Sequence, residues 1–95
     1  MKVEEKNNLS KLFDAYGGLL SEGQQEIMAS YINYDLTVTE IAENLKVSRQ
    51  AVKDSISKAE KKLISYEDKL SLVKRIENLL QENEILKKRL SKKED

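Results

Sequence analysis

Two helix-start signals, at Thr37 and at Ser48, constrain the fold of this chain more than any other feature. Thr37 has Glu40 three residues later, which is the spacing of a capping box, and Ser48 is a preferred N-cap residue. Between the two signals, apolar residues recur at helical spacing, namely Ile41, Ala42 and Leu45. Two short helices therefore meet across a turn of about three residues, 46–48, and this arrangement is a helix-turn-helix.

The apolar residues around the turn predict how the two helices cross. Val47 and Val52 stand at the N′ and N4 positions around Ser48, where they would form a hydrophobic staple. Ala42 is expected at the closest approach of the helices, because a larger side chain there would push them apart. We predict that the motif spans residues 37–63 and that the amino-terminal end of its second helix projects outward. There it can enter a DNA major groove about 12 Å wide.

This second helix lies in the basic part of a chain that is neutral as a whole. Residues 46–62 carry six basic and two acidic side chains, a net charge of +4, whereas residues 1–45 carry three and eight, a net charge of −5. Residues 63–95 carry eight and seven, a net charge of +1, so the total is 0. A phosphate-binding surface needs such an asymmetry. The alternative is a helix face that is merely solvated.

The outward side of the second helix carries side chains of the types that read bases and hold phosphates. Arg binds guanine O6 and N7 with two hydrogen bonds, and Gln binds adenine in a similar way. The residues assigned to bases are Arg49, Gln50, Lys53 and Ser57, and those assigned to phosphates are Lys58, Lys61 and Lys62. The predicted nucleic-acid-binding set is Ser48, Arg49, Gln50, Lys53, Ser57, Lys58 and Lys61. Asp54 would repel phosphate and narrows the predicted contact zone.

The rest of the chain, with no proline and three glycines, predicts an all-α fold. A first helix is expected at about 7–20, with an apolar face of Leu9, Leu12, Phe13, Tyr16, Leu19 and Leu20. Gly17 and Gly18 lie inside this pattern and either permit a close helix crossing or end the helix early. Ser21 and Gln24 form a capping-box pair that starts the next helix. Its apolar face would consist of Ile27, Met28 and Tyr31, and then Ile32 or Tyr34.

The last helix has the pattern of a coiled-coil seam. Spacings of four and three alternate along Leu72, Ile76, Leu79, Asn83, Leu86 and Leu90. Asn at a seam position fixes register and favours two parallel strands at a cost in stability. An upstream stripe, Val52, Ile56, Ala59, Leu63, Tyr66, Leu70 and Val73, is offset from the seam. The packing partner is therefore predicted to change near residue 70.

We expect a helical domain at 1–70, a coiled-coil helix at 71–91 and a tail at 92–95. The seam predicts a homodimer. The alternative is that the last helix folds back on its own domain.

The absent residue types exclude several function classes. There is no Cys and no His, which excludes the usual zinc sites and Cys or His nucleophiles. The carboxylates are plentiful, but none is paired with a nucleophile, a phosphate loop or a metal-ligand cluster. We therefore expect no enzyme activity, no cofactor and no bound metal. No apolar run approaches the roughly 18–20 residues that span a bilayer, and no secretory signal is visible, so the expected location is the cytoplasm.

Residues 37–52 resemble region four of bacterial sigma factors, which binds the −35 promoter element. The segments that carry the likeness are Thr37-Val-Thr-Glu-Ile-Ala-Glu-Asn-Leu45 and Lys46-Val-Ser-Arg-Gln-Ala-Val52, and the likeness continues to Ala59 and Leu63. Two positions depart from the sigma pattern. Lys46 stands where Gly is frequent, and Ser55 stands where an apolar residue is usual, with Ile56 next to it.

Most of residues 7–70 is similar to the YlxM family of small bacterial helix-turn-helix proteins. The matching pieces are Leu19-Leu20-Ser21 with Gln24, Glu40-Ile41-Ala42-Glu43, Ser48-Arg49-Gln50-Ala51-Val52, and Tyr66-Glu67 with Lys69-Leu70. Members of this family are typically encoded beside genes of the signal recognition particle. The resemblance implies an accessory or regulatory part in that pathway.

Two functions are compatible with these features. The first is a homodimeric regulator that binds nucleic acid, either DNA or the RNA of the signal recognition particle, through the second helix of the motif. The second is an accessory protein that contacts the RNA or the GTPase of that particle without binding DNA. The helix-turn-helix fold serves both kinds of contact, so the fold alone does not decide between them.

Overall fold

The computed structural model describes the backbone of residues 3–93 and the side chains of residues 7–92. Residues 94 and 95 of the expected tail lie outside the described residues. The described part contains no strand, so the predicted all-α fold is confirmed. Its elements are α1 (Val3–Tyr16), the 3₁₀ turn η1 (Gly17–Leu19), α2 (Glu22–Ile32), α3 (Val38–Leu45), α4 (Arg49–Leu70) and α5 (Leu72–Lys93).

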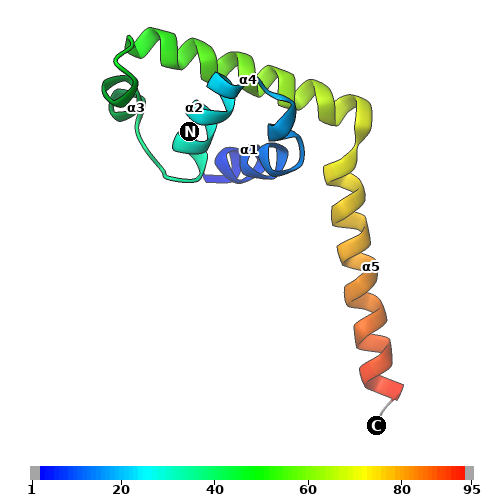
Figure 1. The fold of residues 1–95 in the computed structure, drawn as a ribbon. Coiled ribbons are helices and arrows are strands. Elements are labelled where there is room, and N and C mark those ends of the chain that lie inside the picture. The colour runs from blue at the N-terminus through cyan, green and yellow to red at the C-terminus, as the bar shows by residue number, and fades with distance from the viewer. Residues whose placement is uncertain (1–2, 94–95) are drawn as a thin grey trace.

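Helix α4 is the element against which the first three helices pack (Figure 1). It runs along one side of the body, with α3 near its start and α1 near its end, and α5 leaves the body at a corner. The projection of α5 makes the molecule elongated, with extents of 61 × 26 × 22 Å. In the described part, no helix is both long enough and apolar enough to cross a membrane.

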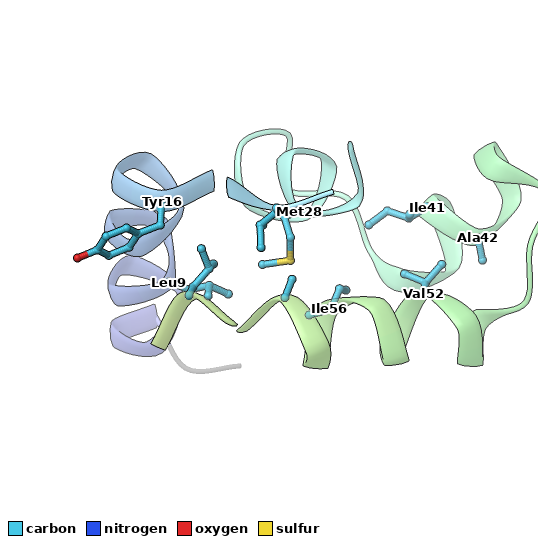
Figure 2. Close-up of a cluster of buried hydrophobic side chains, with 10 residues drawn as sticks. Leu9, Tyr16, Met28, Ile41, Ala42, Val52 and Ile56 are labelled. Carbon is cyan, nitrogen blue, oxygen red and sulfur yellow. The ribbon is translucent and has the colours of Figure 1, made fainter. Parts of the chain in front are cut away.

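The core is built on one stripe of α4 (Figure 2). The stripe consists of Val52, Ile56, Ala59 and Leu63, all of them buried. The other helices and the turns between them contribute Leu9, Tyr16, Leu20, Met28, Ile41 and Ala42. The 3.6-residue periodicity that predicted the apolar faces therefore identifies most of the core.

The first helix ends earlier than its apolar pattern predicts. Helix α1 stops at Tyr16, and Gly17 and Gly18 belong to the 3₁₀ turn, so the glycines end the helix. The helix also begins at Val3, before the predicted start at residue 7. The tighter turn moves Leu19 off the buried face, where 59% of its surface stays exposed, so its prediction as a core residue is wrong.

The second helix begins as the sequence predicts. The Ser21 hydroxyl accepts from the amide of Gln24 at 3.3 Å, and the Ser21 amide donates to Oε1 of Gln24 at 3.4 Å. Both halves of the capping box are therefore present. At the other end of α2, Ile32 packs against the core, whereas Tyr34 is 73% exposed. Of the two alternatives, Ile32 is therefore the residue that completes the apolar face.

A polar cluster of Tyr16 and Glu67 joins the body to the start of α5. The Tyr16 hydroxyl donates to the Glu67 carboxylate at 2.6 Å and accepts from the amide of Leu72 at 3.0 Å. The Glu67 carboxylate also accepts from the amides of Val73 at 3.0 Å and Lys74 at 3.2 Å. Three free amides of the first turn of α5 are thus satisfied. The backbone turns the corner between α4 and α5 at Ser71, whose φ of 54° is left-handed (Figure 1).

The same contacts shift two pKa values in opposite directions. The hydrogen bond from Tyr16 lowers the pKa of Glu67, and the amides of Val73 and Lys74 lower it further against the effect of burial. Burial raises the pKa of Tyr16, and the hydrogen bond to Glu67 raises it as well. The corner is therefore built from an ionised Glu67 and a neutral Tyr16.

The two glycines of η1 should respond differently to Ala. A Cβ at Gly17 would lie 2.8 Å from Cε1 of Phe13, whereas a Cβ at Gly18 would meet nothing within 4 Å. We expect Gly17→Ala to lower the free energy of unfolding by about 1–3 kcal/mol, because the Phe13 ring must move. Gly18→Ala, the matched control, should change it by less than about 1 kcal/mol. Urea unfolding followed by circular dichroism measures both, and equal effects would contradict the close packing at Gly17.

The corner should weaken in acid. Because the folded-state pKa of Glu67 lies below its usual value of 4.5, the carboxylate stabilises the fold above about pH 4.5, and this contribution is lost as the pH falls through the folded-state pKa. We expect Glu67→Gln to lower the unfolding temperature at pH 7 and to have a much smaller effect at pH 3. Asp68→Asn, which removes the neighbouring exposed carboxylate, is the control for general charge effects. An equal decrease in the unfolding temperature at both pH values would contradict a stabilising role of the ionised Glu67 carboxylate.

Candidate nucleic-acid interface

Side-chain caps start both helices of the motif, as predicted. The Thr37 hydroxyl accepts from the amide of Glu40 at 3.1 Å, and the Glu40 carboxylate accepts from the amide of Thr37 at 3.1 Å. The Ser48 hydroxyl accepts from the amide of Ala51 at 3.0 Å. Helix α3 therefore begins at Val38 and α4 at Arg49, one residue after each cap.

The turn between the helices depends on Lys46, which adopts a left-handed conformation with φ 58° and ψ 43°. Its amide donates to the carbonyl of Glu43 at 3.3 Å, and the amide of Val47 donates to the carbonyl of Ala42 at 3.1 Å. These bonds satisfy the last carbonyls of α3. A left-handed conformation costs a residue other than Gly roughly 1–2 kcal/mol, so the turn keeps its geometry at Lys46 against a local preference.

The crossing of α3 and α4 is tightly packed. Ile41 and Ala42 of α3 and Val52 of α4 are buried, so the small side chain of Ala42 lies inside the contact as its size predicts. Val47, the outer member of the expected staple, keeps 46% of its surface exposed. The contact between α3 and α4 is therefore made mainly by residues of the two helices and less by the turn residue Val47. The second helix also continues past the predicted end of the motif at residue 63, to Leu70.

The predicted nucleic-acid-binding residues all lie on exposed positions of α4 and its cap. At about 100° per residue, Gln50, Ser57 and Lys61 fall within a sector of about 40° that faces away from the buried stripe. Lys53 and Lys58 lie on either side of that sector. Gln50 and Lys61 are separated by eleven residues, or about 17 Å of helix. We call these five residues, together with the exposed Asp54 that lies among them, the outward face of α4.

The outward face includes one ordered polar pair that the sequence reasoning missed. The Nε2 atom of Gln50 donates to the carboxylate of Asp54 at 2.9 Å. The pair has the i, i+4 spacing that brings side chains together on a helix, and this spacing could have indicated it. Gln50 therefore commits one of its two amide N–H donors to Asp54, and Asp54 places a negative charge beside Lys53.

Arg49 and Lys62 lie apart from the outward face. Arg49 lines an open depression of about 580 Å³ at the turn, together with Thr39, Glu43 and Lys46. This depression carries both signs of charge. Lys62 donates from Nζ to Oε1 of Gln24 in α2 at 3.2 Å, so it faces α2 rather than the rest of the basic set.

Helix α5 presents its seam to solvent. The apolar seam residues Leu72, Ile76, Leu79, Leu86 and Leu90 are between 40% and 63% exposed. Asn83 is exposed as well. Only the first turns of α5 meet the body, where Lys11 of α1 pairs with Glu77 at 2.9 Å. The remainder projects away from the body, so the alternative of a fully folded-back helix is not what the structure has (Figure 1).

Among the residues that the structure describes, no group of three or more acidic side chains is placed to hold a metal ion. The chemistry that the site offers is that of hydrogen-bond donors and positive charges on a rigid helix. It suits binding to a polyanion.

Comparison with known proteins assigns the family. Residues 3–95 match the family of helix-turn-helix proteins described as YlxM / p13 like. The UPF0122 protein of Clostridium botulinum (strain Alaska E43 / Type E3) is 45% identical over 73 residues, which are 77% of this chain and 67% of the relative. That of Clostridium perfringens (strain SM101 / Type A) is 42% identical over 90 residues, 95% of this chain and 80% of the relative.

The UPF0122 protein of Lactococcus lactis subsp. cremoris (strain MG1363) is 38% identical over 92 residues, 97% of this chain and 80% of the relative. The match thus covers the motif, the Tyr16–Glu67 corner and α5 together. The chain belongs to the YlxM / p13-like family of helix-turn-helix proteins.

Proposed function

We propose that this protein is a non-enzymatic regulator that binds nucleic acid through the outward face of α4 and acts as a homodimer. The observation that carries the proposal is the position of that face. Lys53, Ser57, Lys58 and Lys61 are all exposed, and α5 projects away from the body instead of covering them. A helix-turn-helix presents its second helix to the major groove in this way.

The distribution of charge supports the same proposal. The net charge of +4 over residues 46–62 contrasts with −5 over residues 1–45. Glu40 and Glu43 are exposed on α3, the first helix of the motif, and Asp54 lies on the outward face itself. Contact with phosphates therefore concentrates on α4, because the acidic side of α3 would repel them.

The biological setting is part of the proposal. The resemblance to the YlxM family implies a role in the signal recognition particle pathway, and a regulator in that pathway would bind either DNA or the RNA of the particle. Lys and Arg side chains bind the phosphates of both nucleic acids. The proposed protein partners are the components of the particle.

One observation favours the second candidate, an accessory protein that contacts the particle's RNA or GTPase without binding DNA. The Gln50–Asp54 hydrogen bond uses one of the two amide N–H donors of Gln50 and holds the side chain along its own helix, whereas base reading in the major groove needs this amide turned toward a base. Direct base reading also requires donors and acceptors to be free at the groove floor. Phosphate contacts or protein contacts by Lys53, Lys58 and Lys61 do not depend on that donor.

Binding measurements with matched variants test the proposal. Labelled random-sequence duplex DNA, signal-recognition-particle RNA and the GTPase of the particle are titrated in parallel with the wild-type protein and with Lys53→Ala/Lys61→Ala, at low and moderate salt. We expect the double variant to lose about tenfold or more in affinity, and the slope of log K against log salt to fall by about 2. Lys88→Ala/Lys92→Ala removes the same charge from exposed positions of α5 and should retain the affinity.

Each outcome separates the candidates. Binding to duplex DNA that the α4 variant loses and the α5 variant keeps supports the DNA-binding regulator. Binding to the RNA or to the GTPase alone supports the accessory role and removes the base-reading assignments of Arg49 and Gln50. If neither nucleic acid nor the GTPase is bound, the proposed function is overturned.

A further inference from the structure

The exposed seam of α5 has a complete heptad assignment. Ile76, Asn83 and Leu90 occupy the a positions, and Leu72, Leu79 and Leu86 occupy the d positions. Leu at every d position together with Ile at an a position favours two strands, and a single Asn at a favours pairing with the same Asn of the other strand. Both preferences indicate that α5 pairs with one other helix of the same sequence.

We propose that α5 pairs with α5 of a second copy as a parallel, in-register, two-stranded coiled coil. This inference rests on the homodimer of the proposed function and adds its partner surface, orientation and register. Asn83 then faces Asn83 of the second copy, where the two amides can hydrogen-bond to each other. Every d-position Leu meets its own equivalent.

Charge complementarity selects the parallel orientation. In a parallel pair, a g residue lies beside the e residue five positions later on the other strand. Glu82 is a g residue and Lys87 is an e residue. In a two-fold symmetric dimer, Glu82 of each copy therefore lies beside Lys87 of the other, which gives two attractive pairs. Both side chains are exposed in the single chain and free to turn toward a partner strand.

An antiparallel pair of the same overlap is disfavoured. That orientation places g residues beside g residues, so Glu82 would face Glu82 of the second copy and Arg75 would face Arg89. It would also set Asn83 opposite Leu79, which leaves a buried amide without a partner. The same sequence therefore carries two attractive charge pairs in one orientation and repulsive pairs in the other.

The body contributes a second surface to the dimer. A groove of about 330 Å³ lies between α1 and the start of α5, and its walls include Val73, Ile76 and Leu80. Asp14 and Glu77 line the same groove. Val73 and Leu80 are e positions, so the apolar stripe is broader than the seam on the side that faces α1.

Parallel pairing brings Arg75 of the second copy, a g residue, beside Leu80. Its aliphatic stem can cover Leu80 while its guanidinium approaches the carboxylate of Asp14, since Glu77 is already paired with Lys11. Fewer than three full heptads make a marginal coiled coil, and this groove adds contact area where α5 meets the body. The two helix-turn-helix units then stand at the same end of the coiled coil, related by a two-fold axis.

Charge reversal tests the orientation directly. Glu82→Lys and Lys87→Glu are prepared separately, and the dimer dissociation constant is measured by sedimentation without nucleic acid. We expect each variant alone to dissociate about tenfold more readily, because two attractive pairs become repulsive. An equimolar mixture should recover the wild-type affinity as a heterodimer, since both of its pairs are again attractive. Lys88→Glu, an exposed f-position change of the same charge, is the control and should leave the dimer intact.

The antiparallel arrangement gives a different pattern. There Lys87 has no Glu82 partner, so the Lys87→Glu homodimer would be as stable as the wild type, and this result would overturn the proposal. A wild-type chain that stays monomeric at all accessible concentrations would also overturn it. Loss of nucleic-acid binding with an intact dimer, in contrast, contradicts only the proposed function.

A distance measurement provides an independent readout. The chain contains no Cys, so Lys92→Cys accepts one spin label in each copy without side reactions. In the parallel dimer the two labels lie at the same end of the coiled coil. In the antiparallel dimer they are displaced by roughly 30 Å along the axis, at 1.5 Å per residue. Pulsed electron paramagnetic resonance measures the distance between the labels and resolves these two cases. A distance distribution that contains only the long distance would contradict parallel pairing.

Discussion

Every other helix of the body depends on a single apolar stripe of α4. Val52 meets α3 at the crossing of the motif, and Ile56, Ala59 and Leu63 continue the same line of contact toward α2 and α1. Because α1, α2 and α3 all pack against α4, one side of α4 is buried along its first four turns. The opposite side is then left to polar residues, and the outward face follows from this division. The stripe thus determines both the core and the position of the outward face.

The corner at Tyr16 and Glu67 extends this order to α5. A single αL residue such as Ser71 could leave two helices at many relative angles, but here the first amides of α5 are bonded to side chains that belong to α1 and α4. The direction of α5 is therefore fixed by hydrogen bonds to the body as well as by the backbone conformation at Ser71. Tyr16 therefore has two structural roles: its ring packs in the core, and its hydroxyl forms hydrogen bonds at the corner.

Local signals predicted the elements well, and contacts between distant residues account for what they missed. The caps at Ser21, Thr37 and Ser48 act within four residues, so the sequence shows them directly. The exposure of Leu19 depends on the 3₁₀ geometry at Gly17, for which the sequence left two alternatives. The Tyr16–Glu67 contact spans 51 positions and has no local pattern. For the candidate site, residue types and exposure could be predicted. The hydrogen bond of Lys62 to Gln24 and the place of Arg49 in the depression at the turn depend on the packing of α2 and α3 against α4.

The outward face lies toward the start of α4 and the exposed seam runs along α5, and the corner joins these two helices of 22 residues each. If the second copy binds along α5, the relative position of the two outward faces depends on the length of α4 and on the angle at the corner. A flexible linker would leave that spacing undefined, whereas the bonds of Glu67 to the first turn of α5 restrict it. Spacing between half-sites is a geometric property of a dimeric helix-turn-helix protein. In the proposed dimer, the Tyr16–Glu67 corner therefore couples the stability of the fold to the spacing of the two outward faces.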